Sequence, residues 1–181
     1  MELKQLTEKM IEILKVEDTN DMSEKLFEVV KNNDIEAYKQ FCDLVENDLS
    51  RDWLQMIFQY YHADRKDKKQ DYTPKTVAEF MSLLVGDNAD TIIDMCAGSG
   101  ALTIQKWNMN NNIKFELYEL DTNVIPFLLF NMAVRNIECT VYNADILQQE
   151  IINTYKIEKG DKFGIFKEVE NEHSFNFKST I

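Results

Sequence analysis

The chain has 181 residues, 44% of them hydrophobic and 11% aromatic, which is enough for a packed core and excludes global disorder. Its net charge of −12 argues against a protein that grips duplex DNA by itself, because such proteins neutralise several phosphates with Lys and Arg. The sequence contains no long apolar run and no signal-peptide pattern, and its 3 cysteines are too scattered for a disulfide framework or a zinc site. We therefore expect a cytoplasmic protein without a membrane anchor.

Residues 1–70 are predicted to form an N-terminal helical region. Apolar residues recur there at helical spacing in four segments, as in the series Leu3, Leu6, Met10 and Leu14. We expect Ser50 to be the N-cap of the fourth helix. Because residues 1–73 contain neither Gly nor Pro, no flexible linker is visible. We expect this region to pack on the rest of the chain.

Residues 71–181 are predicted to form an α/β domain. A helix after Pro74 is followed by three short apolar strands, at 91–95, 113–121 and 139–145, with helical segments between them. This order indicates a parallel sheet with right-handed crossovers. A fourth strand is expected within 162–169. The prediction is an incomplete Rossmann-like sheet of about four parallel strands.

An acidic residue stands at the end of each of the three strands: Asp94, Glu119 and Asp145. Ligands of such sheets bind outside the carboxyl ends of the strands. Gly98 and Gly100 let the backbone approach a ligand closely, and a helix with free N–H groups begins next. Glu119 can accept both hydroxyls of a ribose, and Asp145 can accept a hydrogen bond from an adenine amino group. The pattern therefore predicts a site for a nucleoside cofactor.

The residues around Gly98 and Gly100 distinguish between the nucleoside cofactors that such a site could bind. A dinucleotide site of the G-x-G-x-x-G type is incomplete, since its third position is Thr103, and a P-loop is absent. Asp94 would also repel a phosphate. S-adenosyl-L-methionine suits the pattern better, because its methionine end carries an ammonium and a sulfonium that favour a nearby carboxylate.

Four motifs over roughly residues 50–150 resemble adenine-N6 DNA methyltransferases, above all the modification (methyltransferase) subunit of type I restriction-modification systems. They are Gln70-Asp71-Tyr72-Thr73-Pro74, Asp94-Met95-Cys96-Ala97-Gly98-Ser99-Gly100, "LYELDTN…FNMAVRN" and Asn143-Ala144-Asp145-Ile146-Leu147. The resemblance implies that the Tyr-Thr-Pro segment closes over the methionine end, that the glycine loop wraps the cofactor, and that the later acids bind ribose and adenine. The implied cofactor-binding residues are Tyr72, Thr73, Pro74, Asp94, Cys96, Ala97, Gly98, Ser99, Gly100, Glu119, Leu120, Asp145 and Ile146.

The catalytic motif of that family, Asn or Asp followed by Pro-Pro and Tyr or Phe, is not found. The sequence has only 2 prolines, Pro74 and Pro126, and they are not adjacent. "ENEH" stands at the expected place within residues 161–177, where Asn171 is chemically reminiscent of the family's Asn. We assign no catalytic residue and no metal ligand. The family's remaining strands and target-recognition region are also expected to lie outside this chain.

Three interpretations fit these features. The favoured one is an S-adenosylmethionine-binding relative of N6-adenine DNA methyltransferases that is not catalytically self-sufficient and acts by binding a partner or sensing the cofactor, for example as an anti-restriction decoy. Another is one part of a split methyltransferase, completed by a partner chain that supplies catalysis and DNA contacts. A third is an enzyme on a small molecule or protein, with another residue as base. The acidic charge favours a protein partner, such as a missing methyltransferase or specificity subunit, with DNA contacted weakly or through it.

Overall fold

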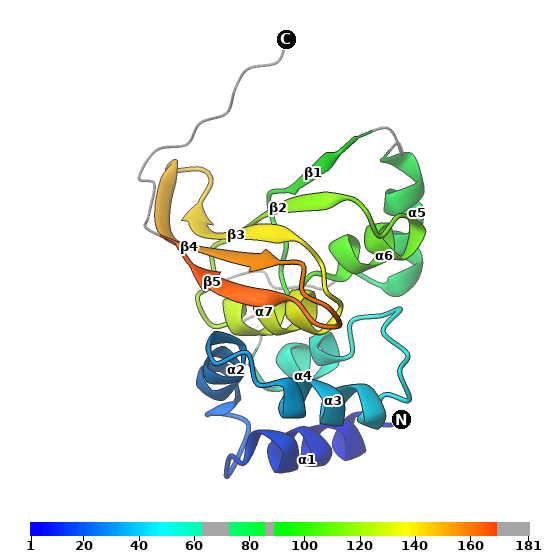
Figure 1. Cartoon of the computed structure of the whole chain (residues 1–181), viewed down its shortest axis with the longest axis vertical. Helices are drawn as coiled ribbons and strands as arrows, with labels where there is room; N and C mark the ends of the chain where they lie inside the picture. Colours follow the sequence, from blue (N-terminus) through cyan, green and yellow to red (C-terminus); the bar gives the residue numbers. More distant parts are fainter. Residues whose placement is uncertain (63–72, 86–88, 170–181) are drawn as a thin grey trace.

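The computed structural model describes residues 1–62, 73–85 and 89–169, so the segment with Asn171 lies outside the described residues. Within these ranges, no helix is long and apolar enough to cross a bilayer. The described chain has one sheet with helices packed against it, and the N-terminal helices lie together on one side of it, with the first of them farthest from the strands (Figure 1).

The N-terminal region folds into α1 (Leu3–Leu14), α2 (Met22–Lys31), α3 (Ile35–Leu44) and α4 (Leu54–Tyr61). The predicted apolar series is buried, with Leu6, Met10 and Leu14 at most 1% exposed. The prediction that Ser50 caps the fourth helix is wrong. The helix begins at Leu54, and the Asp52 carboxylate accepts the Gln55 N–H at 3.0 Å, while the Ser50 hydroxyl donates to Asp48 Oδ1 at 2.5 Å.

The remainder of the described chain alternates helices and strands before ending in two consecutive strands. The elements are α5 (Lys75–Leu84), β1 (Thr91–Asp94), α6 (Ala101–Met109), β2 (Lys114–Glu119), α7 (Ile125–Val134), β3 (Cys139–Asp145), β4 (Glu150–Glu158) and β5 (Ile165–Glu168). The strands form one sheet in the order β1-β2-β3-β4-β5. As predicted, β1, β2 and β3 are parallel. Their carboxyl ends therefore lie at one edge.

The prediction of four parallel strands is wrong beyond β3. β4 was not expected, and it pairs antiparallel with β3. Residues 146–149 are the whole connection, and a parallel crossover needs a dozen or more residues. Gln149 adopts a positive φ of 56° in this tight turn. The strand expected within 162–169 exists as β5, but it runs antiparallel to β4.

The helical region and the sheet share one hydrophobic core centred on α7. All ten residues of this helix are buried. Phe130 packs edge-on against Tyr38 and Phe41, with ring centroids 5.5 and 5.1 Å apart, and Phe127 packs against Phe58 at 5.2 Å. Such aromatic pairs contribute about 0.5–1.5 kcal/mol beyond the area they bury. α7 thus holds the carboxyl edge of the sheet in a fixed relation to the N-terminal helices.

Candidate cofactor-binding site

The loop after β1 is a tight turn that requires its glycines. Asp94 Oδ1 accepts the Cys96 N–H at 3.1 Å as the strand ends. Gly98 and Gly100 have φ values of 55° and 99°, in the region that disfavours residues with a Cβ. A Cβ on Gly100 would lie 2.8 Å from Met132 Cε on α7. Glycine therefore lets the loop rest directly on α7 before α6 begins.

Glu119, at the end of β2, is bonded to this loop. Its Oε2 accepts the Gly98 N–H at 2.8 Å, and its Oε1 accepts the Asp121 N–H at 2.8 Å. The Ala97 N–H donates to the Tyr118 carbonyl at 2.9 Å. The structure thus brings together the loop and the acid that the sequence predicted to share a site.

The end of β3 supports the same edge. Asn143 is fully buried, and its Nδ2 donates to the carbonyls of Glu119 and Leu120, both at 3.0 Å. Asp145, two residues further on, accepts the Gln148 N–H through Oδ1 at 2.9 Å. Since β2 and β3 are parallel neighbours with Glu119 in register with Asn143, Asp145 lies at the same edge as Glu119.

The other predicted site residues differ in exposure. Cys96 and Leu120 are exposed, Leu120 by 56%, whereas Ala97 and Ser99 are buried and Ile146 is half-buried. The exposed pair lies on the solvent side of the edge, where a ligand has access. The buried residues form the base of the loop.

The Tyr-Thr-Pro segment is described only from Thr73 onward, and Tyr72 lies outside the described residues. Thr73 lines a cavity of about 130 Å³ together with Asp52 and Ala101, the first residue of α6. Its carbonyl accepts from Gln55 Nε2 at 3.3 Å, and Pro74 is the N-cap of α5. Thr73 is therefore placed beside the helix that follows Gly100.

The electrostatics of the loop favour a cation. Burial raises the pKa of Asp94 and of Glu119 above their usual range, although backbone N–H groups partly offset this for both. The pKa of the Cys96 thiol is raised by burial and by the negative charges of Glu119 and Asp94. A ligand with positive charge and hydroxyl donors would stabilise these carboxylates in their ionised form. Over the described ranges, no group of three or more His, Cys, Asp or Glu residues could hold a metal ion.

Three residues behind the loop were not predicted as site residues: Asp52, Asn131 and Arg135. Asn131 Nδ2 donates to the Ser99 carbonyl and to Asp52 Oδ1, both at 2.9 Å. Arg135 Nη1 donates to Asn131 Oδ1 at 2.8 Å. The sequence did contain an indication of them, an Asn and an Arg near the end of a helical segment that is otherwise apolar. Polar side chains buried in such a helix need hydrogen-bond partners elsewhere in the chain.

A comparison with protein families identifies the family of this chain. The family described as N-6 DNA methylase matches residues 45–165, which is more than half of the chain. The match includes the glycine loop, Glu119 and Asp145. The comparisons with curated proteins and with solved structures gave no match. By its match over 45–165, this chain belongs to the N-6 DNA methylase family.

Proposed function

We propose that this chain, a relative of DNA adenine methyltransferases, binds S-adenosylmethionine and does not methylate DNA by itself. Proteins of its family generally use this cofactor. The observation that carries the proposal is the 2.8 Å bond from the Gly98 N–H to Glu119, because it makes the glycine loop and the acid of β2 one cradle. A cytoplasmic location and a kinship with type I restriction-modification subunits are part of the same proposal.

The residues present fit the cofactor. Asp94 offers a partly desolvated carboxylate to an ammonium or a sulfonium. Each oxygen of Glu119 accepts one backbone N–H, and a carboxylate has about four acceptor positions, so capacity remains for two ribose hydroxyls. Asp145, at the end of β3, would accept from the adenine amino group. When bound, the cofactor would supply a methyl group activated for transfer.

The proposed lack of self-sufficiency rests on the sequence. Methylation of a base in duplex DNA requires the base to leave the stack and to be held in a pocket. The Pro-Pro turn that the family uses for this step is absent from the 181 residues, and the net charge of −12 disfavours phosphate contacts. We therefore propose that transfer to adenine needs a further protein component.

Calorimetric titration with S-adenosylmethionine tests the proposal. Glu119→Ala should weaken binding about 10- to 150-fold, because losing hydrogen bonds to a charged group costs roughly 1.5–3 kcal/mol. Glu116→Ala is the matched control, since its side chain points to the opposite face of β2 and should leave binding unchanged. If the wild-type protein gives no heat and no thermal shift with millimolar cofactor, the proposal is wrong.

A second candidate, the split methyltransferase, is supported by the edge of the sheet at β1. In the described structure this strand pairs only with β2. A cavity of about 170 Å³ opens beside it, lined by residues that include Ile92, Ile93, Met81 and Leu102. Ligand sites of open α/β sheets form where the strand order reverses, and a strand added beside β1 would create such a point there. We propose that a second polypeptide adds a strand parallel to β1 and places an apolar side chain in this cavity.

Methyl transfer from labelled cofactor to unmethylated DNA tests this second candidate. The purified chain alone should stay at background, and activity should appear when the product of the adjacent gene is added. Ile93→Lys, at the free edge of β1, should abolish that gain while leaving cofactor binding intact. Association without methyl transfer would instead favour the non-catalytic partner-binding module, and transfer by the chain alone would contradict both candidates.

A further inference from the structure

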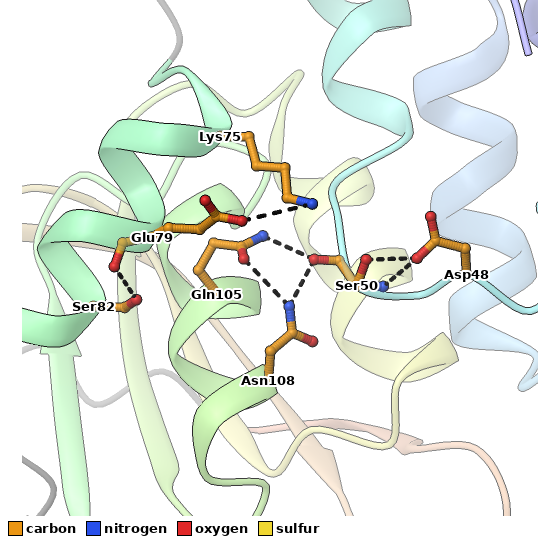
Figure 2. A network of polar contacts seen from close by, with 7 residues as sticks. All are labelled: Asp48, Ser50, Lys75, Glu79, Ser82, Gln105 and Asn108. Atoms are coloured by element: carbon orange, nitrogen blue, oxygen red, sulfur yellow. Dashed lines mark hydrogen bonds and ion pairs between the residues drawn. The ribbon is translucent and has the colours of Figure 1, made fainter.

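Residues 48–53, the second part of the connection between α3 and α4, are held against α6 and α7. We call them the junction segment. Figure 2 shows the Ser50 carbonyl accepting from two side chains of α6, Gln105 Nε2 at 2.8 Å and Asn108 Nδ2 at 2.6 Å. Since α6 begins directly after Gly100, the junction segment is fixed to the helix that the glycine loop starts.

Arg135, at the end of α7, binds the same segment from the other side. Its Nε donates to the Leu49 carbonyl at 2.9 Å, and its Nη2 donates to the Arg51 carbonyl at 2.7 Å. The side chain is buried, and burial lowers the pKa of this guanidinium to about 10, against the opposing effect of Asp52. The junction segment is thus hydrogen-bonded to side chains of α6 on one side and to Arg135, at the end of α7, on the other.

Asp52 links the junction segment to the glycine loop through Asn131. Its buried Oδ1 accepts from the Gln55 N–H at 3.0 Å and from Asn131 Nδ2 at 2.9 Å. Asn131 Nδ2 also donates to the Ser99 carbonyl, and Asn131 Oδ1 accepts from Arg135. Because an amide nitrogen has two N–H groups, Asp52 and Ser99 together use both. Asp52 and Arg135 therefore fix together the orientation of the amide that holds the loop.

The Ser99 carbonyl lies between the two glycines. It shares a planar peptide unit with the Gly100 N–H, which donates to the Ala97 carbonyl at 2.9 Å. A bond that holds the Ser99 carbonyl therefore also holds the turn between Ala97 and Gly100. Within this turn, the Gly98 N–H donates to Glu119. Burial raises the pKa of Asp52, and the nearby Ser99 hydroxyl and the Arg135 charge oppose this rise.

We infer that Asp52 is a positioning residue for the cofactor loop, acting through Asn131 on the Ser99 carbonyl, so that the N-terminal helical region is part of the cofactor site. The functional side of this inference rests on the proposed S-adenosylmethionine binding. The structural side, that Asp52 holds the loop in shape, can be measured without any ligand.

Titration of three variants tests the functional side. Asp52→Ala should weaken S-adenosylmethionine binding about tenfold or more, because Asn131 loses the acceptor that orients it. Asp52→Asn keeps an acceptor at Oδ1 and should bind within about threefold of wild type. Met10→Ala, a cavity in the helical core away from the loop, should lower stability without changing affinity. Folded Asp52→Ala that binds like Met10→Ala would overturn the inference.

Amide hydrogen exchange without ligand separates this inference from the proposed function. In Asp52→Ala, the Gly98 and Gly100 amides should exchange about tenfold faster than in Met10→Ala at equal global stability. If Asp52→Ala does not fold, amide exchange of the wild-type protein in low urea tests the inference instead. The Gln55, Gly98 and Gly100 amides should then open with the same free energy. Loop amides that open independently of Gln55 would refute the positioning role, even where the cofactor binds. A wild type that binds no cofactor but shows the shared opening would refute only the proposed function.

Discussion

Two helices of equal length flank the sheet, and their surroundings differ sharply. α7 lies between the strands and most of the N-terminal region, although α2 also contacts β4 and β5 directly, and all ten residues of α7 are buried (Figure 1). α5, which packs against α6, buries only Ala78 and Ser82, and leaves Phe80, Leu83 and Leu84 exposed by 58%, 70% and 63%. Most residues of both helices are apolar, although α5 also carries Lys75 and Glu79, so its exposed large side chains reflect what covers it among the described residues.

The candidate site lies between these two environments. Its glycine loop rests on α7 through Gly100, whereas Ile93 and Met95, on the β1 side, are exposed. A contiguous exposed apolar surface usually marks an interaction site. The α7 flank thus stabilises the fold, whereas the flank formed by α5 and β1 leaves large apolar side chains exposed.

The largest expected effect is on the α7 flank. Phe130→Ala should lower the free energy of unfolding by about 3–5 kcal/mol, because it removes the ring that packs on Tyr38 and Phe41. Urea denaturation followed by circular dichroism measures this loss. A loss below about 1 kcal/mol would mean that the helical region is not held by α7.

The contact between the loop and α7 should show an intermediate effect. Gly100→Ala places a Cβ near Met132 and forces a non-glycine residue to a φ of 99°. Such backbone strain costs about 1–3 kcal/mol, which thermal unfolding would detect. An unchanged melting temperature would indicate that the loop adopts another conformation in solution.

The two carboxylates of the candidate site, Asp94 and Glu119, should make cofactor affinity depend on pH. Burial raises the pKa of Asp94 and Glu119, and a cationic ligand favours their ionised forms. Affinity should therefore be full above these raised pKa values and fall as pH decreases through them, by at most about tenfold per pH unit for each group. Titrations at several pH values check the sign, and affinity that rises on acidification would contradict it.

The smallest effect is expected on α5. Leu83→Ser should change the free energy of unfolding by less than about 0.5 kcal/mol, because the side chain is already 70% exposed. The same variant should weaken association with any protein that covers α5. A stability loss comparable to that of Phe130→Ala, measured by the same urea titration, would remove the contrast between the two flanks.

Local pattern was sufficient to predict much of this molecule. The helical spacing of Leu6, Met10 and Leu14 and the alternation of strands and helices after residue 90 predicted α1 and the three parallel strands. The glycines and Glu119 were predicted to share a site because parallel strands end at one edge, and the Gly98–Glu119 bond joins them.

The rest could not be read from local pattern. β4 was missed because its turn contains neither Gly nor Pro, and Gln149 adopts the positive φ instead. Asp52 was missed because its partner Asn131 is 79 residues away in sequence. Contacts of that kind depend on packing between elements, and a single sequence does not reveal them.

We propose above all that the glycine loop and Glu119 form one S-adenosylmethionine cradle. A titration followed by amide ¹H–¹⁵N spectra tests this proposal most directly. We expect saturable shifts at Gly98, Gly100, Glu119, Leu120 and Asp145, with Ile165–Glu168 of β5 unchanged. Loop amides that stay in place at saturating cofactor, or shifts confined to residues far from this edge, would contradict it.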